Sequence, residues 1–214
     1  KYDPGPIEYI AASAAKKLRD KRLHQDFDFS SDSPPLHVRL YVPEEYPAPL
    51  KEEQTFWNEL EASCALDDRA VARVVEIGLP EQLDSPQKIE LAQQMAEYVF
   101  KAERIPLELI VREKNGGTIA SLVIAHARFV QYSWETVKKK TRLETQSSWR
   151  LAFTTLANKA LRAAGVTVEE TGEEPPKRYE VSIYSGISVA SEFLDRMLEN
   201  GGDPNEPTVY TFRD

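Results

Sequence analysis

Basic side chains are concentrated in two short stretches of this sequence. The seven positions 16–22 contain five positive residues, and the five positions 138–142 contain four. The residues concerned are Lys16, Lys17, Arg19, Lys21, Arg22, Lys138, Lys139, Lys140 and Arg142. Lysine and arginine clustered in this way are typical of a surface that binds nucleic-acid phosphates, although a solvated helix end or loop has the same composition. Whether the two stretches meet in space decides between these interpretations.

Residues suited to metal or nucleophilic chemistry are scarce. There are three histidines, His24, His37 and His126, and a single cysteine, Cys64, which excludes an internal disulfide and a cysteine-rich zinc site. His37 lies on the polar face of a predicted strand and His126 in an apolar one, so surface and packing roles are expected for them. The sequence has no Gly-rich phosphate loop and no nucleophile elbow. We therefore expect no bound metal and no cofactor.

The first half of the chain predicts helices and strands in mixed order. Positions 7–25 place alanine and leucine on one helical stripe without Gly or Pro, which predicts a helix with a basic tail. Positions 36–42 alternate between apolar and polar residues and predict a strand. Further elements are a helix over 52–66, a strand over 71–79 and a helix that begins at Ser85-Pro86.

The second half predicts a β-hairpin followed by a long helix. Two strands, 107–111 and 119–130, are joined by the turn Lys114-Asn115-Gly116-Gly117. The apolar stripe over 142–164 predicts the clearest helix, with Gly165 as its C-terminal cap. The remaining predicted elements are an acidic linker at 169–176, a strand at 179–183, a helix at 190–198 and a closing strand at 208–212.

These elements define the expected fold class and domain organisation. Strands and helices do not alternate strictly, so the class is α+β, with an antiparallel-rich central sheet and helices packed on it. The 214 residues are enough for one domain with a small extension. We expect an α+β domain over 1–170 and a strand–helix–strand extension over 171–214 that packs on it.

Composition limits the function further. The chain has 27 Lys+Arg against 35 Asp+Glu, a net charge of −8, which argues against indiscriminate coating of nucleic acid but leaves room for a local basic surface. No apolar run approaches the roughly 18 residues that span a bilayer, and the first residues lack the apolar core of a signal peptide. We therefore expect a cytoplasmic protein without a membrane partner.

Five stretches, taken in order, resemble the MobA/MobL family of plasmid-mobilisation relaxases. The family patterns are a strand V-H-S-E-I-L-L-P, a helix L-W-N-x-V-E-x, a strand R-E-x-E-I-A-L-P, the helix after it, and W-A-x-x-x-N-x-A-L-x-x-A-G. The matching stretches of this chain are 36–43, 56–62, 72–80, 85–100 and 149–165. No single motif is specific, and the resemblance depends on their order and spacing over about residues 10–170. It implies a relaxase-like fold.

The resemblance also implies a chemistry, which this chain is predicted to have lost. The family nicks DNA with a tyrosine in its first helix, in an A-A-Y-R context, and with a metal ion held by three histidines on the hairpin strands. The stretch that matches the tyrosine is 14–18, with Lys17 in the place of the site residue, and Tyr9 lies about two turns too early. Arg112, Ile119 and Ser121 stand where the histidines are expected. An aliphatic side chain offers no lone pair to a metal, and a guanidinium repels one.

The family also opens with a strand before its first helix. That strand either lies outside the given chain or is replaced by 208–212.

The sequence therefore favours a catalytically inactive relaxase-like protein of a plasmid or mobile element, and it argues against an enzyme. Its expected partner is single-stranded or duplex DNA, or a relaxosome or other mobile-element protein. DNA would be held by the two basic stretches and by Arg112, whose guanidinium could contact a phosphate directly. Two alternatives stay open: a protein-interaction module without DNA binding, and a metal-dependent nuclease with a rebuilt site. The candidate ligands of that rebuilt site are His37, Glu76, Glu108 and Glu113.

Overall fold

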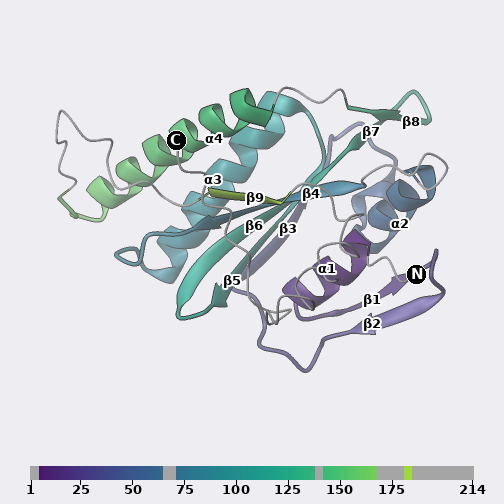
Figure 1. Cartoon of the computed structure of the whole chain (residues 1–214), viewed down its shortest axis with the longest axis horizontal. Coiled ribbons are helices and arrows are strands. Elements are labelled where there is room, and N and C mark those ends of the chain that lie inside the picture. Colours follow the sequence, from purple (N-terminus) through teal and green to yellow (C-terminus); the bar gives the residue numbers. More distant parts are fainter. Residues whose placement is uncertain (1–4, 65–70, 138–141, 168–180, 185–214) are drawn as a thin grey trace, which may run out of the picture.

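A five-stranded antiparallel sheet forms the centre of the protein (Figure 1). The computed structural model describes residues 5–64, 71–137, 142–167 and 181–184. The strands, in their order across the sheet, are β3 (His37–Tyr41), β5 (Leu107–Lys114), β6 (Gly117–Ala125), β4 (Ala72–Gly78) and β9 (Val181–Tyr184). The expected α+β class with an antiparallel sheet is confirmed.

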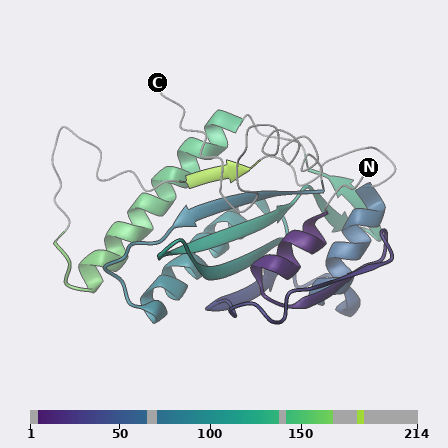
Figure 2. The same ribbon diagram turned by 60° about the horizontal axis from the view of Figure 1, so that its bottom comes forward.

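Helices cover both faces of this sheet (Figures 1 and 2). On one face lie α3 (Ser85–Glu103) and α4 (Arg142–Ala163), and on the other lie α1 (Pro6–Ser13) and α2 (Glu53–Cys64), which the short 3-10 helix η1 (Ala48–Lys51) precedes. Strands β5 and β6 are therefore buried over most of their length. A polar side chain on either strand must consequently point at a helix, at the hairpin end or at another polar group.

The predicted helix over 7–25 is wrong beyond its first two turns. Helix α1 ends at Ser13, Ala15 has a φ of 47°, and the chain continues as a β-hairpin of β1 (Lys17–Asp20) and β2 (Gln25–Asp28). Leu18 and Phe27 pair across this hairpin and are both buried, as is Asp20, whereas Lys17 and Arg19 are exposed. This tertiary burial of every second residue overrides the helical propensity of the stretch.

The other predicted helices are present with small changes at their ends. Helix α3 is capped by Asp84 rather than by Ser85, because the Asp84 carboxylate accepts from the Gln87 N–H in a capping box. Gly165 follows α4 with a φ of 76°, as expected of a C-terminal cap.

The predicted strand over 119–130 is divided into two. Strand β6 ends at Ala125, and β7 (Ala127–Val130) leaves the main sheet to pair with β8 (Ser133–Thr136). His126 lies at the division, where its N–H donates to the Val71 carbonyl. The small β7–β8 sheet packs beside α2 through the rings of Phe129 and Trp134.

Only part of the predicted C-terminal extension lies within the described residues. Strand β9 confirms the strand expected near 179–183, and it pairs with β4 at one edge of the sheet. The linker at 169–176, the helix at 190–198 and the strand at 208–212 lie outside the described residues. The division of the chain into 1–170 and 171–214 stays a prediction.

The hairpin turn gives a first test of the fold. Asn115 and Gly116 both have positive φ, 52° and 80°, as a type I′ turn requires. Gly116→Ala is expected to lower the free energy of unfolding by about 1 kcal/mol, because an L side chain is strained in this conformation. Gly78→Ala is the control: an added Cβ at Gly78 meets no atom within 4 Å, and the change should stay within about 0.5 kcal/mol. Urea denaturation of the two variants measures the difference, and equal effects would contradict the assigned turn.

Candidate functional site

A cluster of polar side chains lies between α1 and the sheet, toward the turn that joins β5 and β6. Its members are Tyr9 of α1, Glu76 of β4, Arg112 and Lys114 of β5, and Ser121 of β6. The strand register explains why the sheet residues meet. Glu76 and Ser121 are direct cross-strand partners, and Ser121 also pairs with Ile110, two positions before Arg112. Alternation then places all four on the face that α1 covers.

Glu76 is the centre of this cluster. The Tyr9 hydroxyl donates toward Glu76 Oε1 at 3.2 Å and lies 3.3 Å from Ser121 Oγ. Lys114 Nζ donates to Glu76 Oε2 at 3.1 Å and Oε1 at 3.3 Å, and Arg112 Nη2 lies 3.4 Å from Oε1. The Arg112 distance is long for a charged pair, in which 2.7–2.9 Å is usual. Glu76 therefore binds Lys114 more closely than it binds Arg112.

The cluster carries an excess of positive charge that is only partly shielded from solvent. Two cations face one carboxylate, and the side chains of Arg112 and Lys114 keep 25% and 21% of their exposure. The buried Arg112 Nε has no hydrogen-bond acceptor among the described residues. Burial, and next the charge of Glu76, raise the pKa of Tyr9 far above its usual value. The Tyr9 phenol therefore keeps its proton at neutral pH and acts as a donor.

The residues that the resemblance placed at the family site divide into two groups. Arg112 and Ser121 lie in the cluster, and Ile119 is the cross-strand partner of Arg112. Lys17 lies elsewhere, on β1, where its ammonium pairs with Asp26 at 3.3 Å. Assigning Lys17 to the first helix was wrong because that helix ends at Ser13.

Sequence reasoning did not assign Tyr9 or Lys114 to this site. Tyr9 lies about two helical turns before the stretch 14–18, which matches the tyrosine motif of the family, so the resemblance does not assign it to the site. The sequence predicts Lys114 only as part of the turn, although it is two positions from Arg112 and therefore on the same face of β5. Glu76 is predicted only as a metal ligand of the rebuilt nuclease site. Strand alternation, read together with the β5–β6 register, is the signal that could have grouped Lys114 with Arg112 and Ser121.

These side chains do not fit a metal ion of the kind that the resemblance implies. A guanidinium and an isoleucine stand at two of the expected ligand positions, and neither can donate a lone pair to a cation. No three His, Cys, Asp or Glu side chains among the described residues come close enough together to hold a metal. A mechanism routed through a metal at this place therefore has no support from the donor set.

The four candidate ligands of a rebuilt nuclease site do not come together either. His37 faces α3, where its Nε2 lies 3.1 Å from Gln93 Nε2, and burial followed by the charge of Arg39 lowers its pKa. Glu113 lies on the same face and accepts from Thr118. Glu76 and Glu108 lie on the opposite face of the sheet, beneath α1 and α2.

The first basic stretch forms the β1–β2 hairpin and its approach, and carboxylates face its cations. Lys17 and Arg19 both pair with Asp26, at 3.3 and 2.8 Å, and these contacts lower the pKa of Asp26, the one with Arg19 most. Lys21 lies 3.6 Å from Glu59. The hairpin is therefore a mixed-charge surface.

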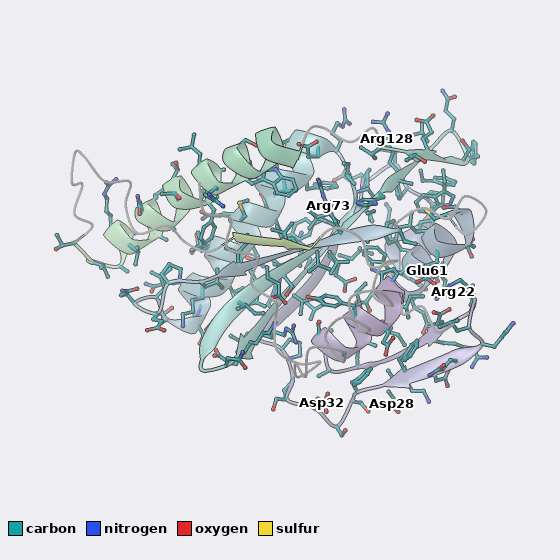
Figure 3. All side chains as sticks on the ribbon, viewed as in Figure 1. Arg22, Asp28, Asp32, Glu61, Arg73 and Arg128 are labelled. Carbon is teal, nitrogen blue, oxygen red and sulfur yellow. The ribbon has the colours of Figure 1, made fainter. Side chains whose placement is uncertain are left out.

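The last cation of this stretch, Arg22, lies beside Glu61 in Figure 3, with Nε 3.6 Å from Glu61 Oε2. Gly5 is part of the same close packing, because a Cβ added there would meet the Glu61 carboxylate. A role for Arg19, Lys21 and Arg22 in DNA binding stays a prediction.

Most of the second basic stretch lies outside the described part of the chain. Residues 138–141 lie outside the described residues, and Arg142 is described only as the first residue of α4. DNA contacts by Lys138, Lys139, Lys140 and Arg142 stay a prediction.

Lys16 belongs to a second buried network, which α2 covers. Its ammonium contacts Glu53 and lies 3.8 Å from Glu108 Oε1, while Trp57 Nε1 donates to Glu108 Oε2 at 2.6 Å. Glu108 is fully buried. Burial, and next the neighbouring Glu53, raise the pKa of Glu108, while Lys16 opposes that rise. Lys16 therefore lies between two carboxylates next to α2, and its contact with DNA stays a prediction.

The fold is similar to that of a solved protein, and part of the chain matches a family model. A solved structure from work on the molecular basis of vancomycin resistance transfer in Staphylococcus aureus superposes with a TM-score of 0.68 and 21% identity, covering 80% of this chain and 92% of that one. The model of the MobA/MobL family matches residues 7–105, which confirms the resemblance that the sequence motifs indicated.

The conjugative relaxase TrwC, in a metal-bound complex with oriT DNA, is more distant: its TM-score is 0.46 at 9% identity, over 74% of this chain and 72% of that one. No curated protein gives a significant sequence match. None of the helices in the described part of the chain has the length and apolar character to cross a bilayer.

Proposed function

We propose that this protein is a mobile-element component that binds DNA through the relaxase-like face of its sheet, without metal-dependent nicking. The observation that supports the proposal is the Arg112–Lys114–Glu76 cluster. It puts two cations at the place where the family resemblance implies three histidines and a metal. Cations at this place attract a phosphate and repel a metal ion.

The proposal predicts DNA binding that weakens steeply with salt. Fluorescence anisotropy with a labelled, mixed-sequence single-stranded 20-mer measures Kd at 50 and 200 mM salt. Each phosphate contact adds about −0.7 to the slope of log K against log salt, so about four contacts would weaken binding about 50-fold over this range. Absence of binding at 50 mM salt would contradict the proposal.

The same preparation tests for nicking. Incubation with supercoiled DNA and Mg²⁺ or Mn²⁺ is expected to leave the plasmid intact and to yield no covalent protein–DNA adduct on a denaturing gel. A nicked plasmid would favour the rebuilt nuclease instead.

A protein partner is the second candidate function, favoured by the net charge of −8 and by the carboxylates that face the β1–β2 hairpin. In that case the 20-mer fails to bind even at low salt, whereas the folded protein is intact.

A further inference from the structure

We infer that Arg112 and Lys114 form, together with the Tyr9 hydroxyl, a metal-free binding site for one DNA phosphodiester. Glu76 acts in this site as a built-in competitor of the phosphate. The inference rests on the proposed DNA binding. It places that binding at Arg112 and Lys114, names a backbone phosphate as the group bound, and makes Glu76 its competitor.

The charge of the cluster matches that of the ligand. Among the described residues, Arg112 and Lys114 contribute two positive charges and Glu76 one negative charge, so this group of side chains keeps one unit of positive charge. A phosphodiester carries one negative charge and would complete the neutralisation. Because these side chains are largely withdrawn from solvent, the attraction is stronger than it would be between fully hydrated groups.

Hydrogen-bond donors at the site exceed the acceptors that Glu76 provides. The buried Arg112 Nε has no acceptor among the described residues, and Arg112 Nη2 reaches Glu76 only at 3.4 Å. A buried donor without an acceptor is costly, so an oxygen ligand at this guanidinium is favoured. Phosphate oxygens suit the planar fork of arginine, which binds them in pairs.

Arg112 and Lys114 lie where a DNA strand could approach them from solvent. Lys114 is the last residue of β5, immediately before the turn, and both cations retain between a fifth and a quarter of their side-chain exposure. A DNA strand could therefore reach them across the β5–β6 turn, whereas the centre of the sheet is covered by α1 and α2 (Figure 1). The site suits an extended backbone phosphate at the surface.

Tyr9 has the role of a hydrogen-bond donor in this arrangement. Its hydroxyl already lies within hydrogen-bond distance of Glu76 and Ser121, and its phenol keeps its proton at neutral pH. It can donate to a phosphate oxygen that takes the place of the carboxylate. Binding is therefore expected without a covalent bond to the tyrosine.

The competitor role of Glu76 gives the sharpest test. Glu76→Gln keeps the shape of the side chain and removes its charge, so affinity for the single-stranded 20-mer at 50 mM salt should rise about tenfold. A gain in affinity cannot result from misfolding. The matched control is Glu97→Gln in α3, where Glu97 pairs with the exposed Lys101 on the other side of the sheet. This control changes the net charge equally and should alter Kd less than twofold.

Substitution of Arg112 and Lys114 tests whether these two cations bind the phosphate. Arg112→Gln and Lys114→Gln should each weaken binding about tenfold, and the double variant should reduce the salt slope by about 0.7, the value for one phosphate on a single strand. Lys101→Gln is the control for these changes. Circular dichroism and thermal unfolding confirm that each variant is folded.

The outcomes separate this inference from the proposed function. Binding by the wild type, with Glu76→Gln and Arg112→Gln indistinguishable from the two control variants, would overturn the phosphate site and leave DNA binding in place. A wild type that does not bind removes both. A covalent adduct that Tyr9→Phe abolishes would also overturn the inference, because the tyrosine would then be a nucleophile.

Discussion

Replacement of Trp57 by alanine is expected to lower the free energy of unfolding by about 5 kcal/mol. The indole is fully buried and packs edge-on against Phe56, with 5.0 Å between ring centroids. Removing a buried tryptophan side chain costs about 3–5 kcal/mol. The loss also removes the N–H that donates to the buried Glu108, which adds about 1–3 kcal/mol. Because a domain is stable by only about 5–15 kcal/mol, this variant should be close to unfolding at room temperature.

Urea denaturation followed by far-UV circular dichroism measures this effect. Trp57→Phe separates its two causes, because it keeps most of the packing and loses only the N–H, for an expected cost of about 2 kcal/mol. Trp134→Ala is the matched control at a half-buried site, where the ring lies 5.8 Å from that of Phe56. It should cost clearly less than Trp57→Ala. If Trp57→Ala changed stability by less than about 1.5 kcal/mol, the assigned burial and hydrogen bond would be wrong.

The spacing of apolar residues in the sequence was enough to predict those helices and strands in which the apolar residues form the buried face. Helix α3 and the β5–β6 hairpin are examples, since each has an apolar pattern and an end signal that agree: the turn at Asn115-Gly116 for the hairpin and Pro86 for the helix. The stretch 14–25 lacks such agreement. Its residues favour a helix locally. The chain forms strands there because pairing in the β1–β2 hairpin buries Leu18 and Phe27.

The candidate site could be predicted only where the family resemblance reached it. Arg112 and Ser121 were found because they occupy the positions of the family's ligands. Tyr9 and Glu76 join them through contacts between residues 67 and 112 positions apart in the chain, which no local pattern contains. Helix α1 must end at Ser13 and lie against β4 and β6 before this grouping exists.

The basic stretch 16–22 illustrates the limit of charge counting. Its lysines and arginines stand close together in sequence, but the carboxylates that face them come from other elements. Asp26 approaches from β2, and Glu53 and Glu59 approach from α2. Local positive charge in a sequence predicts a phosphate-binding surface only if the fold leaves those charges without acidic neighbours. The two cations of β5, which form no run in the sequence, have one carboxylate between them.

Lys16→Met is expected to destabilise the protein by about 3 kcal/mol at pH 8. The change removes the cation that lies between Glu53 and the buried Glu108, so two carboxylates are left facing one another. Removing one partner of a buried ion pair costs about 3–5 kcal/mol. The lower end applies here because the side chains of Lys16 and Glu53 remain 29% and 20% exposed.

The stability lost in Lys16→Met should depend on pH, and the ionisation of Glu108 determines the direction of that dependence. Burial, and next the neighbouring Glu53, raise the pKa of Glu108 in the folded state, and removal of Lys16 raises it further. An acid whose pKa is higher in the folded than in the unfolded state binds more protons when folded, so stability falls as pH rises above the ordinary carboxyl value of about 4.3. The difference between wild type and Lys16→Met should therefore be small at pH 4.5 and largest at pH 8.

Thermal unfolding at a series of pH values measures this difference, and Lys101→Met provides the control. Lys101 pairs with Glu97 on the exposed surface of α3, so its loss should cost at most about 0.5 kcal/mol at every pH. Glu108→Gln in the Lys16→Met background should recover most of the stability at pH 8, because an amide at position 108 can accept from Trp57 and donate to Glu53. A Lys16→Met effect of the same size at pH 4.5 and pH 8 would mean that steric fit, and not the two carboxylates, accounts for the loss.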